Sequence, residues 1–191
     1  QADAYLLLKF DGASTEEIEK DYQGVAGICL EQGAYDVLIS DTEERNDSIW
    51  KARGAFLEAI KGSTTYMDEV DVVVPPSQVN TLVEYIHSIE EEAGVRIKSF
   101  GHAGDGNLHV YILKDQLSDE EWERRMKRAM ELIYSKSREL NGKVSGEHGI
   151  GYAKKPYLFE AEDPEVMNLM RGIKRVFDPK NILNPHKVCE E

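Results

Sequence analysis

The chain has 191 residues, which is enough for one domain with a substantial hydrophobic core. Its formal net charge of −13 repels a phosphate backbone, so we expect no nucleic-acid partner. No apolar run approaches the ~20 residues that a membrane-spanning helix needs, and the 2 cysteines are too few for a disulfide framework, so we expect a cytoplasmic location, with peripheral membrane attachment left open.

Apolar runs and helical patterns alternate in the first part of the chain. In chain order, the sequence predicts a strand at 5–10, a helix at 14–33, a strand at 35–40, a helix at 41–62 and a strand at 70–74. The first helix begins with a capping box, in which Ser14 precedes Glu17 by three residues. Pro75 and Pro76 close the last of these strands, because proline cannot donate to a ladder.

The second part of the chain predicts a hairpin between helices. The predicted elements are a helix at 77–89, strands at 95–101 and 107–113, a helix at 118–140 and a short helix at 166–177. Because a glycine-rich turn joins the two strands directly, they pair as an antiparallel hairpin. We therefore predict an α+β fold in a single domain spanning residues 1–191, with helices on one face of an antiparallel sheet and a helical segment at the C-terminal end.

Alternation along the two hairpin strands places two histidines on the polar face. Leu108, Val110 and Ile112 point one way, so His109 points the other way, as does His102 on the preceding strand. The two histidines are seven residues apart, which would place them on opposite faces of one continuous strand. The glycine turn interrupts the strand and lets the two imidazoles meet. Paired imidazoles beside a turn are good zinc ligands. A hairpin with two histidines on its solvated face is an equally open interpretation at this point.

A second segment, at 145–151, adds a carboxylate and a third imidazole to this picture. Glu147 and His148 lie among three glycines, which allow the backbone to approach a ligand closely. A carboxylate beside two histidines completes a three-ligand set with one open position, as a catalytic metal site requires. The two segments together favour a metal site.

Three motifs resemble the C-terminal domain of FAD-linked oxidases: GHAGDGNLH at 101–109, SGEHGIG at 145–151 and DPKNILNP at 178–185. That family includes glycolate oxidase flavin subunits, D-lactate dehydrogenases and D-2-hydroxyglutarate dehydrogenases. The likeness spans almost the whole chain. It implies a ferredoxin-like fold that caps a separate FAD-binding domain, which we expect upstream in a longer protein.

The resemblance implies a role for the residues of both loops. It makes His102, His109 and Glu147 the ligands of a divalent metal, which we expect to be zinc, with manganese or iron as alternatives. It makes His148 the general base that takes the proton of the substrate hydroxyl, while hydride leaves the adjacent carbon for FAD.

The resemblance also implies how the substrate is held. Arg53 corresponds to an arginine that clamps the substrate carboxylate, and Asn107 lines the same pocket. On sequence alone, a solvated helix residue is an equally good interpretation of Arg53. Glu69 stands where some members carry a lysine in the substrate pocket, which puts the binding of a second carboxylate in doubt and favours a monocarboxylate such as lactate or glycolate.

The expected function is that of the C-terminal domain of an FAD-dependent 2-hydroxy-acid dehydrogenase or oxidase of the glycolate or D-lactate type, inactive by itself. The expected partners are the small 2-hydroxy acid, the upstream FAD-binding domain, and an electron-acceptor protein or quinone. Three alternatives stay open: a stand-alone domain that binds a metal or a small acid, a metallohydrolase in which Glu147 or His148 activates water, and a structural interaction module.

Overall fold

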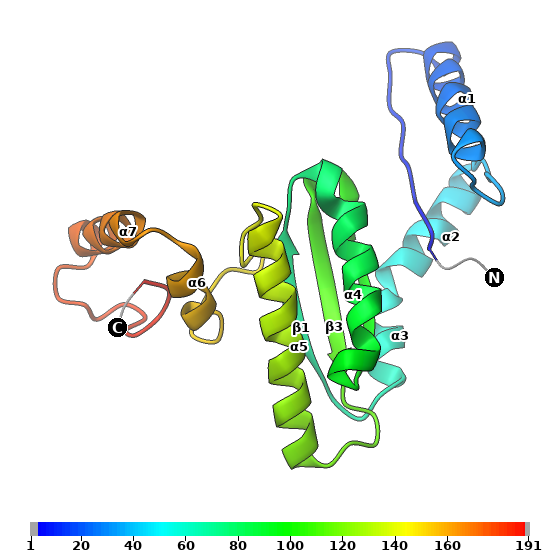
Figure 1. Ribbon diagram of the computed structural model, residues 1–191. Helices are drawn as coiled ribbons and strands as arrows, with labels where there is room; N and C mark the ends of the chain where they lie inside the picture. The colour runs from blue at the N-terminus through cyan, green and yellow to red at the C-terminus, as the bar shows by residue number, and fades with distance from the viewer. Residues whose placement is uncertain (1–3, 190–191) are drawn as a thin grey trace. The chain divides into compact units, whose positions relative to one another are not determined.

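The computed structural model describes residues 4–189, and the chain divides after Ala55 into two compact units. The elements in chain order are α1 (Thr15–Glu31), α2 (Glu43–Gly54), α3 (Phe56–Gly62), β1 (Met67–Val73), η1 (Pro76–Gln78), α4 (Val79–Ala93), β2 (Arg96–His102), η2 (Ala103–Asp105), β3 (Asn107–Leu113), α5 (Asp119–Glu139), α6 (Lys155–Ala161) and α7 (Pro164–Phe177) (Figure 1). The predicted α+β class is confirmed. Each helix in the described part of the chain falls short of the length or the apolarity that crossing a bilayer demands.

The unit that ends at Ala55 contains α1 and α2. Ser14 caps α1 as predicted, its Oγ accepting from Glu17 N at 3.2 Å, but Glu17 Oε2 accepts from Ala13 N at 3.2 Å, one residue before the N–H that a capping box uses. The predicted strands at 5–10 and 35–40 are wrong, because neither segment belongs to a ladder. An apolar run supplies strand propensity, but a strand forms only where a neighbouring backbone pairs with it.

The single helix predicted at 41–62 is also wrong, because two helices occupy this range. Thr42 caps α2 as expected, its hydroxyl accepting from Arg45 N at 3.4 Å. The helix then ends at Gly54, and the N–H of Ala55 is shared between the carbonyls of Lys51 and Ala52. Glycine is among the weakest helix formers, so the periodic apolar pattern does not carry one helix through this point.

The three strands form one antiparallel sheet in the order β1-β3-β2. The chain order β1-α4-β2-β3-α5 is that of the ferredoxin-like unit. Lys143 forms an isolated antiparallel bridge with Val73 of β1, at the place where such a unit has its fourth strand. The ferredoxin-like arrangement is therefore present, with its fourth strand reduced to one bridge.

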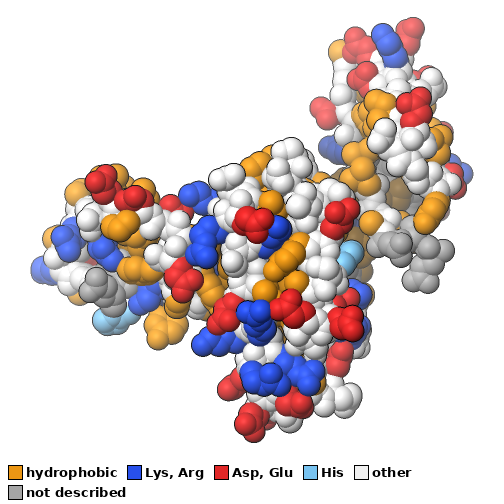
Figure 2. Space-filling view, in the orientation of Figure 1, with side chains coloured by type: hydrophobic (Ala, Val, Ile, Leu, Met, Phe, Trp, Pro, Cys, Tyr) orange, Lys and Arg blue, Asp and Glu red, His pale blue; other side chains and the backbone are white. Residues whose placement is uncertain are grey.

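Helices α4 and α5 cover one face of the sheet, where the hydrophobic core lies (Figure 1). The fully buried members of the core, drawn from the strands and both helices, are Val70, Val72, Leu82, Ile86, Val110, Ile112, Ala129 and Ile133. Each large aliphatic side chain buried here contributes roughly 1.5–3 kcal/mol. The outer sides of both helices carry acidic and basic side chains interspersed (Figure 2), and one pair, Arg128 with Glu92 at 2.7 Å, joins α5 to α4.

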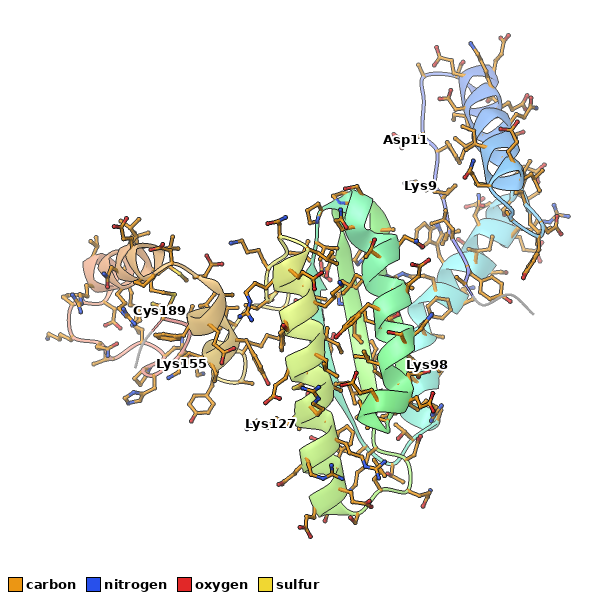
Figure 3. The ribbon with its side chains drawn as sticks, viewed as in Figure 1. Lys9, Asp11, Lys98, Lys127, Lys155 and Cys189 are labelled. Carbon is orange, nitrogen blue, oxygen red and sulfur yellow. The ribbon has the colours of Figure 1, made fainter. Side chains whose placement is uncertain are left out.

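The C-terminal segment packs on α5 through α6. The rings of Tyr134 on α5 and Tyr157 on α6 stack with their centroids 4.1 Å apart. The chain that follows α7 returns to that helix, because Arg171 Nε of α7 donates to the carbonyl of Cys189 at 2.9 Å (Cys189 is labelled in Figure 3). The predicted helix at 166–177 corresponds to α7, whereas α6 was not predicted.

Candidate functional site

The face of the sheet opposite α4 and α5 carries four rows of cross-strand neighbours, each running from β1 through β3 to β2. Three of them concern the site, Val73–Asn107–His102, Asp71–His109–Phe100 and Glu69–Tyr111–Lys98, and the fourth is Met67–Leu113–Arg96. Because successive residues of a strand face opposite sides, these side chains share the face away from the core. The predicted sorting of the two hairpin strands is confirmed.

His102 and His109 meet at the start of the hairpin, as the sequence predicted. Their ring centroids lie 5.6 Å apart and their planes are perpendicular, at 90°. The turn between them depends on Gly106, which has a φ of +74°; a Cβ at this position would lie 1.8 Å from the carbonyl oxygen of Val74. Only glycine fits this turn, so the position of the imidazole pair depends on it.

The loop at 145–148 brings the other two predicted residues to the same place. Glu147 Oε1 lies 3.2 Å from His109 Nε2 and 3.7 Å from His102 Nε2. The ring of His148 stacks on that of His109, with centroids 4.7 Å apart and an interplanar angle of 9°. The structure therefore gathers His102, His109, Glu147 and His148 into one cluster.

Glu69 contacts His148 from the neighbouring row of the sheet. Its Oε1 lies 3.0 Å from His148 Nδ1 and accepts a hydrogen bond from the hydroxyl of Tyr111 at 3.2 Å. The other ring nitrogen of His148, Nε2, lies 3.8 Å from Glu147 Oε1. The two carboxylates thus lie on opposite sides of the imidazole.

Asp71 holds this loop against the sheet, and the sequence analysis did not single it out. Its Oδ2 accepts from the Ser145 hydroxyl at 2.8 Å and from the backbone N–H groups of residues 146, 147 and 148 at 3.0, 3.1 and 2.9 Å. Burial alone would raise the pKa of the Asp71 carboxyl, but these hydrogen bonds and the Lys154 ammonium outweigh it and lower the pKa to about 2. The sequence did offer one sign of this role, because Asp71 interrupts the valine run of β1 and a carboxylate in a buried strand needs hydrogen-bond partners.

The donor set of His102, His109 and Glu147 fits a divalent metal. One ligand atom from each lies within 4.8 Å of the others. In a tetrahedral site with metal–ligand distances of ~2.0–2.1 Å, neighbouring donors lie roughly 3.3 Å apart, close to the two distances that Glu147 makes. Burial, together with the nearby His148, lowers the pKa of His109, which favours the neutral imidazole that binds metals.

A second set of possible donors, Glu69, His109 and His148, shares its central imidazole with the first. A neutral imidazole offers one lone pair, so His109 serves only one of the two sets at a time. The first set borders a cavity of about 300 Å³, whose lining includes His102, Asn107 and Glu147. Access to this cavity favours the first set as the metal site.

Asn107 lines the cavity, whereas Arg53 lies in the other unit. Asn107 is 4% exposed, and a Cβ on Gly146 would lie 2.4 Å from its Oδ1, so the loop passes directly over it. Arg53 is a half-buried residue of α2, and its part in holding a substrate carboxylate stays a prediction.

Comparisons with known proteins point to one family over nearly the whole chain. The sequence model of the family described as FAD linked oxidases, C-terminal domain, matches residues 1–188. The chain is 46% identical over 186 residues to a D-lactate dehydrogenase of Anaerostipes hadrus, covering 97% of this chain and 39% of that protein. It is 38% identical to glycolate oxidase subunit GlcD of Bacillus subtilis, with 98% and 39% covered. A D-2-hydroxyglutarate dehydrogenase of Stutzerimonas stutzeri is 34% identical, with 96% and 40% covered. The chain thus spans about two fifths of the length of these relatives.

Proposed function

This chain belongs to the family of FAD-linked oxidase C-terminal domains, and we propose that it is the metal- and substrate-binding part of an FAD-dependent 2-hydroxy-acid dehydrogenase or oxidase of the D-lactate or glycolate type. One observation carries the proposal. In a metal-type donor set, His102 and Glu147 line a small cavity, and the third member, His109, stacks on a further imidazole, that of His148. The expected partner is an FAD-binding domain.

His102, His109 and Glu147 would hold the metal, expected to be zinc, with manganese or iron as alternatives. A bound divalent metal would act as a Lewis acid toward the oxygens of a 2-hydroxy acid. Two neutral imidazoles and one carboxylate leave a net positive charge on the loaded site. A local cationic centre is what a substrate anion needs in a chain whose formal charge is −13.

His148 would serve as the general base. Glu69 lies 3.0 Å from its Nδ1, which favours the proton on that nitrogen. The lone pair is then on Nε2, the nitrogen that lies toward Glu147, and Nε2 would accept the proton of the substrate hydroxyl. The flavin would accept the hydride from the adjacent carbon. Asn107, which lines the cavity, would help to position the substrate.

Glu69 argues for a substrate with one carboxylate. It contributes a negative charge beside His148, where a second substrate carboxylate would meet repulsion. We therefore place D-lactate or glycolate ahead of D-2-hydroxyglutarate. Replacing Glu69 by lysine in the full-length protein should shift the ratio of kcat/KM values toward D-2-hydroxyglutarate, and an unchanged ratio would contradict this assignment.

The central test is anaerobic reduction of the flavin in the full-length protein. D-lactate or glycolate should bleach the flavin absorbance of the wild type, and His148→Ala should slow this reduction by ~10²–10⁴-fold while metal content stays constant. His87→Ala is the matched control, because His87 is an exposed histidine of α4. An equal rate in His148→Ala, or hydrolysis of esters by the isolated chain without any reduction, would favour the metallohydrolase alternative.

A further inference from the structure

We propose that Asp71 is a positioning residue that uses its two carboxylate oxygens for separate tasks: Oδ2 holds the loop that carries Glu147 and His148, and Oδ1 keeps the proton of His109 on Nδ1. The inference deepens the proposed function and rests on it in one respect, the role of His109 as a metal ligand. Asp71 and His109 are direct cross-strand neighbours in β1 and β3.

Two buried polar atoms lack partners here, and they face each other. Asp71 Oδ1 and His109 Nδ1 both lie without a hydrogen bond, in residues that are 0% and 4% exposed. They are 3.6 Å apart. An unsatisfied buried polar group costs roughly 1–3 kcal/mol, and a shift of a few tenths of an ångström would bring this pair within hydrogen-bonding distance. The carboxylate can only accept, so the imidazole must donate from Nδ1.

The other groups around His109 compete less well for this proton. Glu69 Oε1 lies 3.7 Å from Nδ1, but it already accepts from the Tyr111 hydroxyl and contacts His148 Nδ1 at 3.0 Å. Glu147 Oε1 lies 3.2 Å from Nε2, but its side chain is 53% exposed, so water can satisfy it, whereas the buried Asp71 Oδ1 has no other donor. Phe100 and His148 contact the imidazole through their rings. Asp71 Oδ1 is therefore the acceptor best placed for Nδ1–H.

With the proton on Nδ1, the lone pair of Nε2 points toward Glu147 and is free to bind a cation. Outer carboxylates that orient a ligating histidine in this way typically account for 10–100-fold in metal affinity. Because the other oxygen of the same carboxylate accepts four donors from residues 145–148, one side chain couples a ligand on β3 to the loop that supplies Glu147.

Asp71→Asn separates the two tasks. The four donors of the loop need an acceptor, so the amide oxygen of the new side chain takes the place of Oδ2. The amide NH₂ then faces His109 and donates to its Nδ1, which moves the imidazole proton to Nε2 and opposes metal binding there. We expect the zinc dissociation constant to rise 10–100-fold in this variant.

The decisive readout is the tautomer of His109 in the metal-free chain. Two-bond ¹H–¹⁵N correlation spectra at pH 8, assigned with a His109→Gln variant, distinguish Nδ1–H from Nε2–H. The wild type should show Nδ1–H, and Asp71→Asn should show Nε2–H. This measurement needs neither bound metal nor flavin, so it separates the inference from the proposed function.

Two matched variants keep the test independent of whether Asp71→Asn folds. Ser145→Ala removes one donor to Oδ2 and leaves Oδ1 in place, so His109 should stay Nδ1–H. Glu69→Gln should also leave it Nδ1–H if Asp71 is the acceptor. Nε2–H in the wild type, a switch in Glu69→Gln, or no switch in a folded Asp71→Asn would overturn the inference. If the tautomers behave as expected but zinc does not bind, the inference stands and the proposed metal site fails.

Discussion

Gly146→Ala should displace the loop at 145–148 from the sheet. The added Cβ would lie 2.4 Å from Oδ1 and 2.5 Å from Cγ of Asn107, whose side chain is buried in the sheet. Overpacking of this kind typically costs ~1–3 kcal/mol. A shift of the loop also stretches the hydrogen bonds to Asp71, and bonds to a charged group are worth roughly 1.5–3 kcal/mol each. We expect a loss of about 2–3 kcal/mol in the free energy of unfolding.

Urea unfolding followed by tryptophan fluorescence measures this loss. The chain has 2 tryptophans, so a Trp50→Phe background leaves only Trp122 of α5, which reports on the unit that contains the site. Gly104→Ala is the matched control, because its Cβ would meet nothing within 4 Å, and it should change stability by no more than ~0.5 kcal/mol. Adding Asn107→Ala to Gly146→Ala should restore most of the loss. Equal stability of the two glycine variants, or no recovery in the double variant, would refute the reasoning.

Three further predictions concern local stability. Arg96 lowers the pKa of Asp115 through a bidentate ion pair, so this contribution to stability is present above the ordinary pKa of 3.8 and is lost as the pH falls through the lower folded value. Asp115→Asn should therefore flatten the acid side of the plot of unfolding free energy against pH, and parallel curves would argue against the pair. Gly106→Ala should cost roughly 3 kcal/mol or more, or prevent folding, because it combines a φ of +74° with a Cβ 1.8 Å from the Val74 carbonyl; a soluble variant with wild-type melting temperature would contradict this. Ser14→Ala should destabilise α1 by ~1 kcal/mol, seen as faster amide hydrogen exchange in that helix alone.

The hairpin was predictable from sequence because its two faces differ in polarity. Leu108, Val110 and Ile112 alternate with polar residues, so the strand at 107–113 was located to the residue and its histidines were assigned to the correct face. The strand predicted at 35–40 had comparable propensity, but its residues do not alternate in polarity and no neighbouring strand pairs with it in the described structure. Propensity is local, whereas pairing is not, which is why one strand prediction held and the other failed.

The role of Asp71 was not predictable because its partners are distant in the sequence. The donors to its Oδ2 come from residues 74 to 77 positions further along the chain. No spacing rule connects them, and only the folded sheet brings the loop over β1. Helix α6 was missed for a different reason: its 7 residues are too few to display a helical period.

The proposed function depends most on whether His102, His109 and Glu147 hold a metal. Metal content by mass spectrometry, on untagged and undialysed chain, tests this directly. We expect near-stoichiometric zinc, manganese or iron in the wild type and in the exposed-histidine control His87→Ala, and none in a His102→Ala, His109→Ala double variant. A metal-free wild type, or a double variant that keeps its metal, would contradict it.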